Sequence, residues 1–83
     1  MKAYTIEDTD NLEHIAIVTG DDTKTILDKV ALAVQEHFCI DHEDGVKATV
    51  VTSEHPFQIL CENINDEGDE EMRTINLYNT TIY

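Results

Sequence analysis

Five segments of the chain have the period-two hydrophobic pattern or the β-branched composition that predicts β-strands. The five segments span residues 2–6, 12–19, 46–52, 57–64 and 72–83. The stretches 7–11, 53–56 and 65–71 between them are rich in Asp, Glu, Asn, Ser, Gly and Pro. These residue types favour turns and loops, so the pattern predicts a chain of short strands joined by polar connections.

Between the second and third strands the hydrophobic period changes to about 3.6 residues, which is typical of a helix. Ile26, Val30, Val34 and Phe38 recur at every fourth position. They form one apolar stripe, and the opposite face carries charged and polar side chains. The sequence therefore predicts one amphipathic helix over about residues 22–38.

The ends and exceptions of this helix carry further information. Asp21, Asp22 or Thr23 can cap its first turn, and carboxylates there suit the positive end of the helix dipole. Leu32 falls in the middle of the polar face, either as an incidental exposed leucine or as an interface contact. His37 falls within the apolar arc, and we expect a partly buried histidine at the C-terminus of the helix. After the helix, Gly45 is available for a left-handed conformation.

The order of the elements is β-β-α-β-β-β, which predicts an α+β fold in a single domain over residues 1–83. If each element crosses the domain once, the strands before and after the helix run parallel and are joined by a right-handed crossover. The other consecutive strands form antiparallel hairpins. We therefore expect a mixed sheet of four to five strands with the helix packed on one face.

One helix is too narrow to cover such a sheet. Five strands span roughly 20 Å at a spacing of ~4.8 Å, whereas a helix is about 10–12 Å across. Apolar residues are also expected on the opposite, open face, namely Val18, Val51, Leu60 and Tyr78. This pattern predicts a homodimer through the open face or an edge strand. The alternative is a half-exposed antiparallel face of mixed polarity.

The chain is strongly acidic, with 18 Asp and Glu against 5 Lys and Arg, a formal net charge of −13 and an isoelectric point near 4.3. Direct binding of nucleic acid or of an anionic membrane is disfavoured, because both need clustered basic residues. The 41% hydrophobic content nevertheless predicts a folded domain.

The sequence also bears on where the protein is located. No apolar run has the length of a signal peptide or a membrane helix. Cys39 and Cys61 are interpreted as reduced, buried thiols, so we expect a cytoplasmic protein.

Most of the acidic residues fall in three connections. Residues 7–13, 41–44 and 66–71 hold four, three and five of them respectively, which is twelve of the eighteen. In an up-and-down arrangement these three connections lie at the same pole, which would be electronegative. The candidate interaction residues are the acids of the last two connections together with one exposed helix residue: Asp41, Glu43, Asp44, Asp66, Glu67, Asp69, Glu70, Glu71 and Leu32. Solvated loops are the simpler interpretation of such charge.

Candidate chemistry is sparse. The segment 37–42 contains two histidines and one cysteine, but the spacing matches no zinc motif. The segment 63–74 resembles a calcium-binding loop only superficially, because its first and twelfth positions are Asn63 and Thr74. The three glycines are isolated, so there is no phosphate-binding loop. No catalytic, cofactor or metal site is predicted, and an enzyme is the least favoured class.

Three functions fit these observations. The first is a non-enzymatic protein-interaction domain that uses its acidic loops or its open sheet face to bind a protein partner, and a basic partner would suit the acidic loops. The second is an inhibitor that imitates nucleic acid, in which carboxylates take the place of phosphates at a basic channel. The third is an acidic module that binds a metal ion or another ligand.

Overall fold

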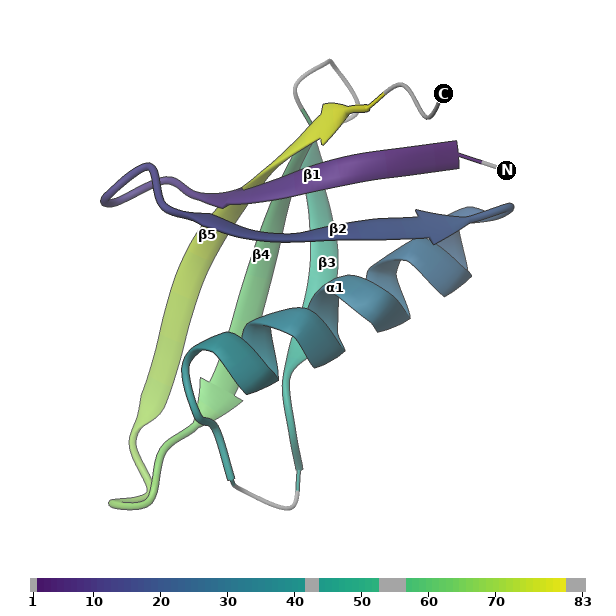
Figure 1. The fold of residues 1–83 in the computed structure, drawn as a ribbon. Helices are drawn as coiled ribbons and strands as arrows, with labels where there is room; N and C mark the ends of the chain where they lie inside the picture. The colour runs from purple at the N-terminus through teal and green to yellow at the C-terminus, as the bar shows by residue number, and fades with distance from the viewer. Residues whose placement is uncertain (1, 42–43, 53–56, 81–83) are drawn as a thin grey trace.

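The computed structural model describes residues 2–41, 44–52 and 57–80 and contains one five-stranded sheet with one helix against it (Figure 1). The elements are β1 (Lys2–Asp8), β2 (His14–Gly20), α1 (Thr23–His37), β3 (Lys47–Thr52), β4 (Phe57–Ile64) and β5 (Glu70–Asn79). The predicted α+β fold and the β-β-α-β-β-β order are confirmed. Within these ranges no helix has the length and apolar composition needed to span a bilayer.

The strands lie in the order β2-β1-β5-β4-β3, and every neighbouring pair is antiparallel. The expectation of a mixed sheet is therefore corrected: β2 and β3 run in the same direction but occupy opposite edges, so they never pair. The last strand inserts between β1 and β4. Its Ile75 and Leu77 are buried, and a strand with such residues gains most from neighbours on both sides.

The sheet twists around the helix. In Figure 1 the β1–β2 hairpin crosses the direction of β3, β4 and β5, and α1 lies diagonally in the concave side between the two parts. As a result α1 packs against both edge strands, β2 and β3. Twist is intrinsic to strands of L-amino acids, and here it lets one helix reach across a sheet wider than itself.

The core forms where the apolar stripe of α1 meets the inner, helix-facing side of the sheet. Val30 and Val34 of the helix are fully buried, as are Ile6, Ile59 and Ile75 of the three central strands. Burial of each such side chain stabilises the fold by about 1.5–3 kcal/mol. The predicted stripe is thus confirmed.

Leu32 and His37, the two exceptions to the helical pattern, are exposed and half-buried respectively. Leu32 is 58% exposed on the outer face of α1. His37 is half-buried in the last turn, as expected, and its Nε2 lies 3.6 Å from Glu13 Oε1 of the β1–β2 loop.

The open face of the sheet has mixed polarity. Val18 was expected there, but it is buried on the inner side, because it lies opposite Tyr4 in the β1–β2 ladder. Leu60 and Tyr78 are half-buried on the open face, where they lie opposite Thr74 and Thr5 respectively. Homodimerisation through this face stays a prediction.

The start of α1 is fixed by Asp22, one of the predicted caps. Its backbone is extended, and its carboxylate accepts a hydrogen bond of 2.7 Å from the Thr25 backbone N–H. This hydrogen bond lowers the pKa of Asp22, so the cap stays ionised at neutral pH. A charged N-cap also favours the helix electrostatically.

The end of α1 is a Schellman motif with an unusual residue at its left-handed position. The Ile40 N–H donates to the Gln35 carbonyl (2.9 Å), and the Cys39 N–H donates to the Glu36 carbonyl (3.3 Å). Cys39 therefore has a φ of +55°, which costs an L side chain about 1–2 kcal/mol and which glycine adopts freely. Gly45 also has a positive φ, as predicted, but it lies farther along the connection.

Substitution of Cys39 tests this helix end. Cys39→Gly is expected to raise the free energy of unfolding by about 0.5–1 kcal/mol, because relief of the left-handed strain exceeds the added flexibility of the unfolded chain. Cys39→Val, β-branched at the same φ, is expected to lower it by about 1 kcal/mol. Urea denaturation measures both changes, and a destabilising glycine would contradict the assignment.

Candidate functional site

Acidic side chains from the α1–β3 connection, the β4–β5 turn and the first two residues of β5 gather around the C-terminal end of β4. Two hollows flank Asn63 and Ile64: one is also lined by Asp44, Glu62 and Glu70, the other by Asp41, Asp66 and Glu71. The α1–β3 connection and the β4–β5 turn, far apart in sequence, therefore lie side by side (Figure 1). We call this surface the acidic end, and its residues are Asp41, Asp44, Asp66, Glu67, Asp69, Glu70 and Glu71.

The structure brings together most of the candidate interaction residues but not all of them. The seven residues of the acidic end are exposed, except Glu71, which is half-buried. Glu43 lies outside the described residues. Leu32 projects from the outer face of α1 and lines neither hollow of the acidic end.

The first of the three acidic connections, residues 7–13, adds less charge to the surface than expected. Glu7 and Asp8 belong to β1 rather than to a loop, and Asp8 is only 5% exposed. The Asp8 carboxylate accepts a hydrogen bond from the Asp10 backbone N–H and so shapes the β1–β2 turn. Glu13 approaches the end of α1 through His37, so its side chain faces the same end of the helix as the α1–β3 connection.

Asn65 holds the β4–β5 turn in shape. Its Oδ1 accepts hydrogen bonds from the backbone N–H groups of Glu67 (3.0 Å) and Asp69 (2.9 Å), and its carbonyl accepts one from Gly68. Gly68 has a φ of +85°, which the turn requires and glycine permits. The turn thus presents its carboxylates from a fixed backbone. The sequence signal for this role was an asparagine at the start of the predicted loop.

The inner face of β4 and β5 becomes more polar toward the acidic end. The cross-strand pairs are, in order, Phe57 with Leu77, Ile59 with Ile75, Cys61 with Arg73 and Asn63 with Glu71. The apolar core therefore gives way to a polar network under the last turn of the helix.

Arg73 is the centre of that network. Its guanidinium donates to Asn63 Oδ1 (3.0 Å), lies 3.9 Å from Glu71 Oε1 and stacks 4.2 Å from the centre of the Phe38 ring. Asn63 Nδ2 in turn donates to Glu71 Oε1 at 3.0 Å. The Arg73 side chain is only 18% exposed, so its charge supports the fold and pairs with Glu71 rather than covering the exposed acids. Sequence reasoning missed Arg73, although its spacing of two from Ile75 marked an inward position.

Two of the lysines form their contacts around α1, away from the acidic end. Lys24 pairs with Asp28 on the helix surface (3.1 Å), and Lys29 donates to the Thr19 carbonyl. Lys47 lines one of the hollows and is the one lysine in contact with the acidic end within the described part of the chain. A surface with this excess of carboxylates carries a potential of several kT at low salt.

The residues described do not assemble a metal site, because no three His, Cys, Asp or Glu side chains among them come together to hold an ion. Both cysteines are free thiols. Cys61 is buried as predicted, and desolvation raises its pKa to about 11, with the nearby Arg73 charge acting in the opposite direction. Cys39 was also expected to be buried, but it is exposed because it occupies the turn that ends the helix.

The chain matches no protein-family model, no curated protein and no solved structure. What the molecule does has therefore to be inferred from its own surface and from the groups that support it.

Substitution of Arg73 tests the polar network. Arg73→Met keeps the apolar stem, but it leaves Asn63 Oδ1 without its donor and the Glu71 carboxylate without its cation, so that Glu71 retains only the bond from Asn63 Nδ2. The expected loss in the free energy of unfolding is about 2–3 kcal/mol. Lys47→Met, with the same change of charge on an exposed residue, should change it by less than about 0.5 kcal/mol. Thermal and urea unfolding compare the variants, and equal stability of the two would contradict the central role of Arg73.

Ionisation of Cys61 gives a pH dependence. Its pKa is raised from 9.0 to about 11 in the folded chain, so the stability supplied by the neutral buried thiol is complete below pH 9.0 and is lost as the pH rises through about 11. The stability difference between the wild type and Cys61→Ala should therefore shrink over this range. A thiol reagent at neutral pH should modify Cys39 rapidly and Cys61 only on unfolding. Fast modification of both thiols would contradict the burial of Cys61.

Proposed function

We propose that the chain is a small, non-enzymatic protein-interaction domain that binds a positively charged surface of a partner protein through its acidic end. One observation supports the proposal: carboxylates from the α1–β3 connection, the β4–β5 turn and the start of β5 line two adjoining hollows at the end of β4, while Arg73 is held inside the fold.

The physical basis of the interaction is long-range attraction followed by short-range pairing. Each exposed pair of opposite charges contributes only about 0.2–1 kcal/mol, so affinity depends on several pairs formed at once. The summed field raises the association rate and selects against acidic competitors. The fixed β4–β5 turn supports this, since Asn65 orders its backbone before any partner arrives.

A nucleic-acid-mimicking inhibitor remains the alternative within the same proposal. In that case the basic surface of the partner normally holds phosphates, and the carboxylates of the acidic end occupy their places. The chain is 42 Å long, and its gathered charge lies toward one end rather than along its length, which favours a compact contact. A cytoplasmic setting is part of the proposal, because an exposed free thiol such as Cys39 suits a reducing compartment.

The test begins with capture of partners by the immobilised chain from the cells that express it. The captured protein is then purified, and its Kd is measured at about 0.05 M and about 0.3 M salt, where screening lengths differ more than twofold. We expect Kd to rise at least about tenfold with salt. Asp66→Asn/Asp69→Asn should raise Kd by roughly three- to tenfold at the lower salt.

A charge-matched control separates the acidic end from net charge. Asp21→Asn/Asp28→Asn removes the same two charges near the start of α1, and its Kd should stay within about twofold of the wild type. Equal weakening by both double variants, or binding unaffected by salt, would contradict the proposal. Displacement of the chain by nucleic acid that binds the same partner would identify the inhibitor, and its absence would leave the general interaction domain.

A further inference from the structure

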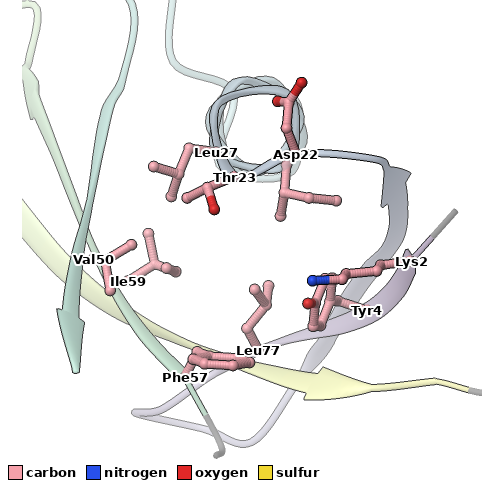
Figure 2. A pocket seen from close by; sticks show the side chains of 10 residues that line it. Lys2, Tyr4, Asp22, Thr23, Leu27, Val50, Phe57, Ile59 and Leu77 are labelled. Carbon is pink, nitrogen blue, oxygen red and sulfur yellow. The ribbon is translucent and has the colours of Figure 1, made fainter. Parts of the chain in front are cut away.

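A second feature lies at the opposite end of the inner face, where the helix does not fill the space above the sheet. A hollow of about 240 Å³ opens between the first half of α1 and strands β1, β3, β4 and β5 (Figure 2). Its walls are apolar and comprise Ile26, Leu27, Val50, Phe57, Ile59 and Leu77. The hollow exists because α1 leans on the two edge strands and leaves the central strands partly uncovered at this end.

Tyr4 supplies the most informative group in this hollow. Its side chain is buried, with only 9% exposed, and its ring packs edge-on against Phe57 with 6.0 Å between centroids. Its hydroxyl lies at the hollow and forms no hydrogen bond with the residues that the structure describes. The hydroxyl is therefore accessible from the hollow, where it can bond to water or to a ligand.

Two more donors converge on the same space. Figure 2 shows the Lys2 ammonium and the Thr23 hydroxyl directed into the hollow, from β1 and from the first turn of α1. Neither has a hydrogen bond or ion pair with another described residue. The carboxylate of Asp22 points away from the hollow and accepts a hydrogen bond from the Thr25 backbone N–H. The hollow therefore combines apolar walls with one cation and two hydroxyls.

We infer that this hollow binds a small amphipathic carboxylate, with its apolar chain against the walls and its carboxylate on Lys2, Tyr4 and Thr23. A carboxylate accepts hydrogen bonds only, and it gains charge-assisted bonds from an ammonium and from hydroxyl donors. The start of a helix adds a favourable dipole for an anion. An amine of the same size would be repelled by the positive charge of Lys2. An alcohol would lack the charge-assisted hydrogen bond.

The volume sets the size of the ligand. At about 30 Å³ for each water molecule displaced, the hollow accommodates roughly eight water volumes, which corresponds to about eight carbon atoms of a ligand whose carboxylate oxygens lie at the donors. Octanoate has this size. The site lies away from the acidic end, so the inference does not rest on the proposed function.

The probe is sodium octanoate, titrated into the isotope-labelled full chain and followed by methyl and amide NMR shifts. For a ligand this small we expect a Kd of roughly 0.1–1 mM. The shifted signals should belong to wall residues such as Ile26, Leu27 and Leu77. Octanol and octylamine, with the same chain, should bind at least about tenfold more weakly.

Variants identify the groups that hold the carboxylate. Lys2→Met keeps the length of an exposed side chain but removes the charge, and it should weaken octanoate about tenfold without changing the affinity for octanol. Lys24→Met carries the same change of net charge on the outer helix surface and should bind octanoate as the wild type does. Thr23→Val should weaken octanoate by roughly threefold. Equal weakening by Lys2→Met and Lys24→Met, shifts spread outside the walls, or octylamine binding as tightly as octanoate would overturn the inference.

Discussion

A single helix has to cover the inner face of a five-stranded sheet, and the rest of the structure depends on how it does so. The twist of the sheet brings both edge strands to the helix, so the stripe containing Val30 and Val34 closes a core over the central strands. The cover is complete only in the middle. Toward the end of α1 the inner face turns polar, and toward its start the face stays apolar and leaves a hollow. The two candidate sites lie at the two ends of the inner face, which the helix does not fully cover.

The polar end shows how a strongly acidic chain keeps its charge outside. Arg73 occupies an inward position of β5 beyond the apolar core, and its contacts with Asn63 and Glu71 pair the polar groups of this part of the inner face. Because the Arg73 side chain is largely buried and pairs with Glu71, it does not cover the exposed carboxylates of the neighbouring connections. The asparagine-centred β4–β5 turn and the Schellman end of α1 set the positions from which these acids project.

The local elements followed from the sequence, whereas their long-range arrangement did not. The helix stripe at Ile26, Val30 and Val34 is visible in spacing alone, because one face of a helix repeats at a fixed period. The placement of β5 between β1 and β4 cannot be predicted from the sequence in this way. Periodicity shows which residues share a face of a strand, but it does not show which strands become neighbours. For the same reason Val18 was assigned to the wrong face: alternation separates Val18 from Ile17 but does not show which of the two faces the helix, and this depends on the pairing of Val18 with Tyr4.

The residues of the candidate sites likewise fall into those that could be recognised from the sequence and those that could not. Asp41, Asp66 and Glu70 could be recognised from charge in predicted loops, since acids in turns are visible in composition. Arg73 and Tyr4 could not, because their roles arise from contacts between elements distant in the chain. The hollow was anticipated only as a shortage of cover, and its three donors meet only once β1 and α1 are placed together.

The central claim is that the acidic end is the surface that a protein partner contacts. The most direct measurement is the NMR footprint of the captured partner on the labelled chain. The account predicts that amide signals of Asp41, Asp44 and residues 65–71 shift or broaden, while those of the open face around Thr5 and Tyr78 do not. A footprint on the open face or around Leu32, with the acidic end unchanged, would contradict it.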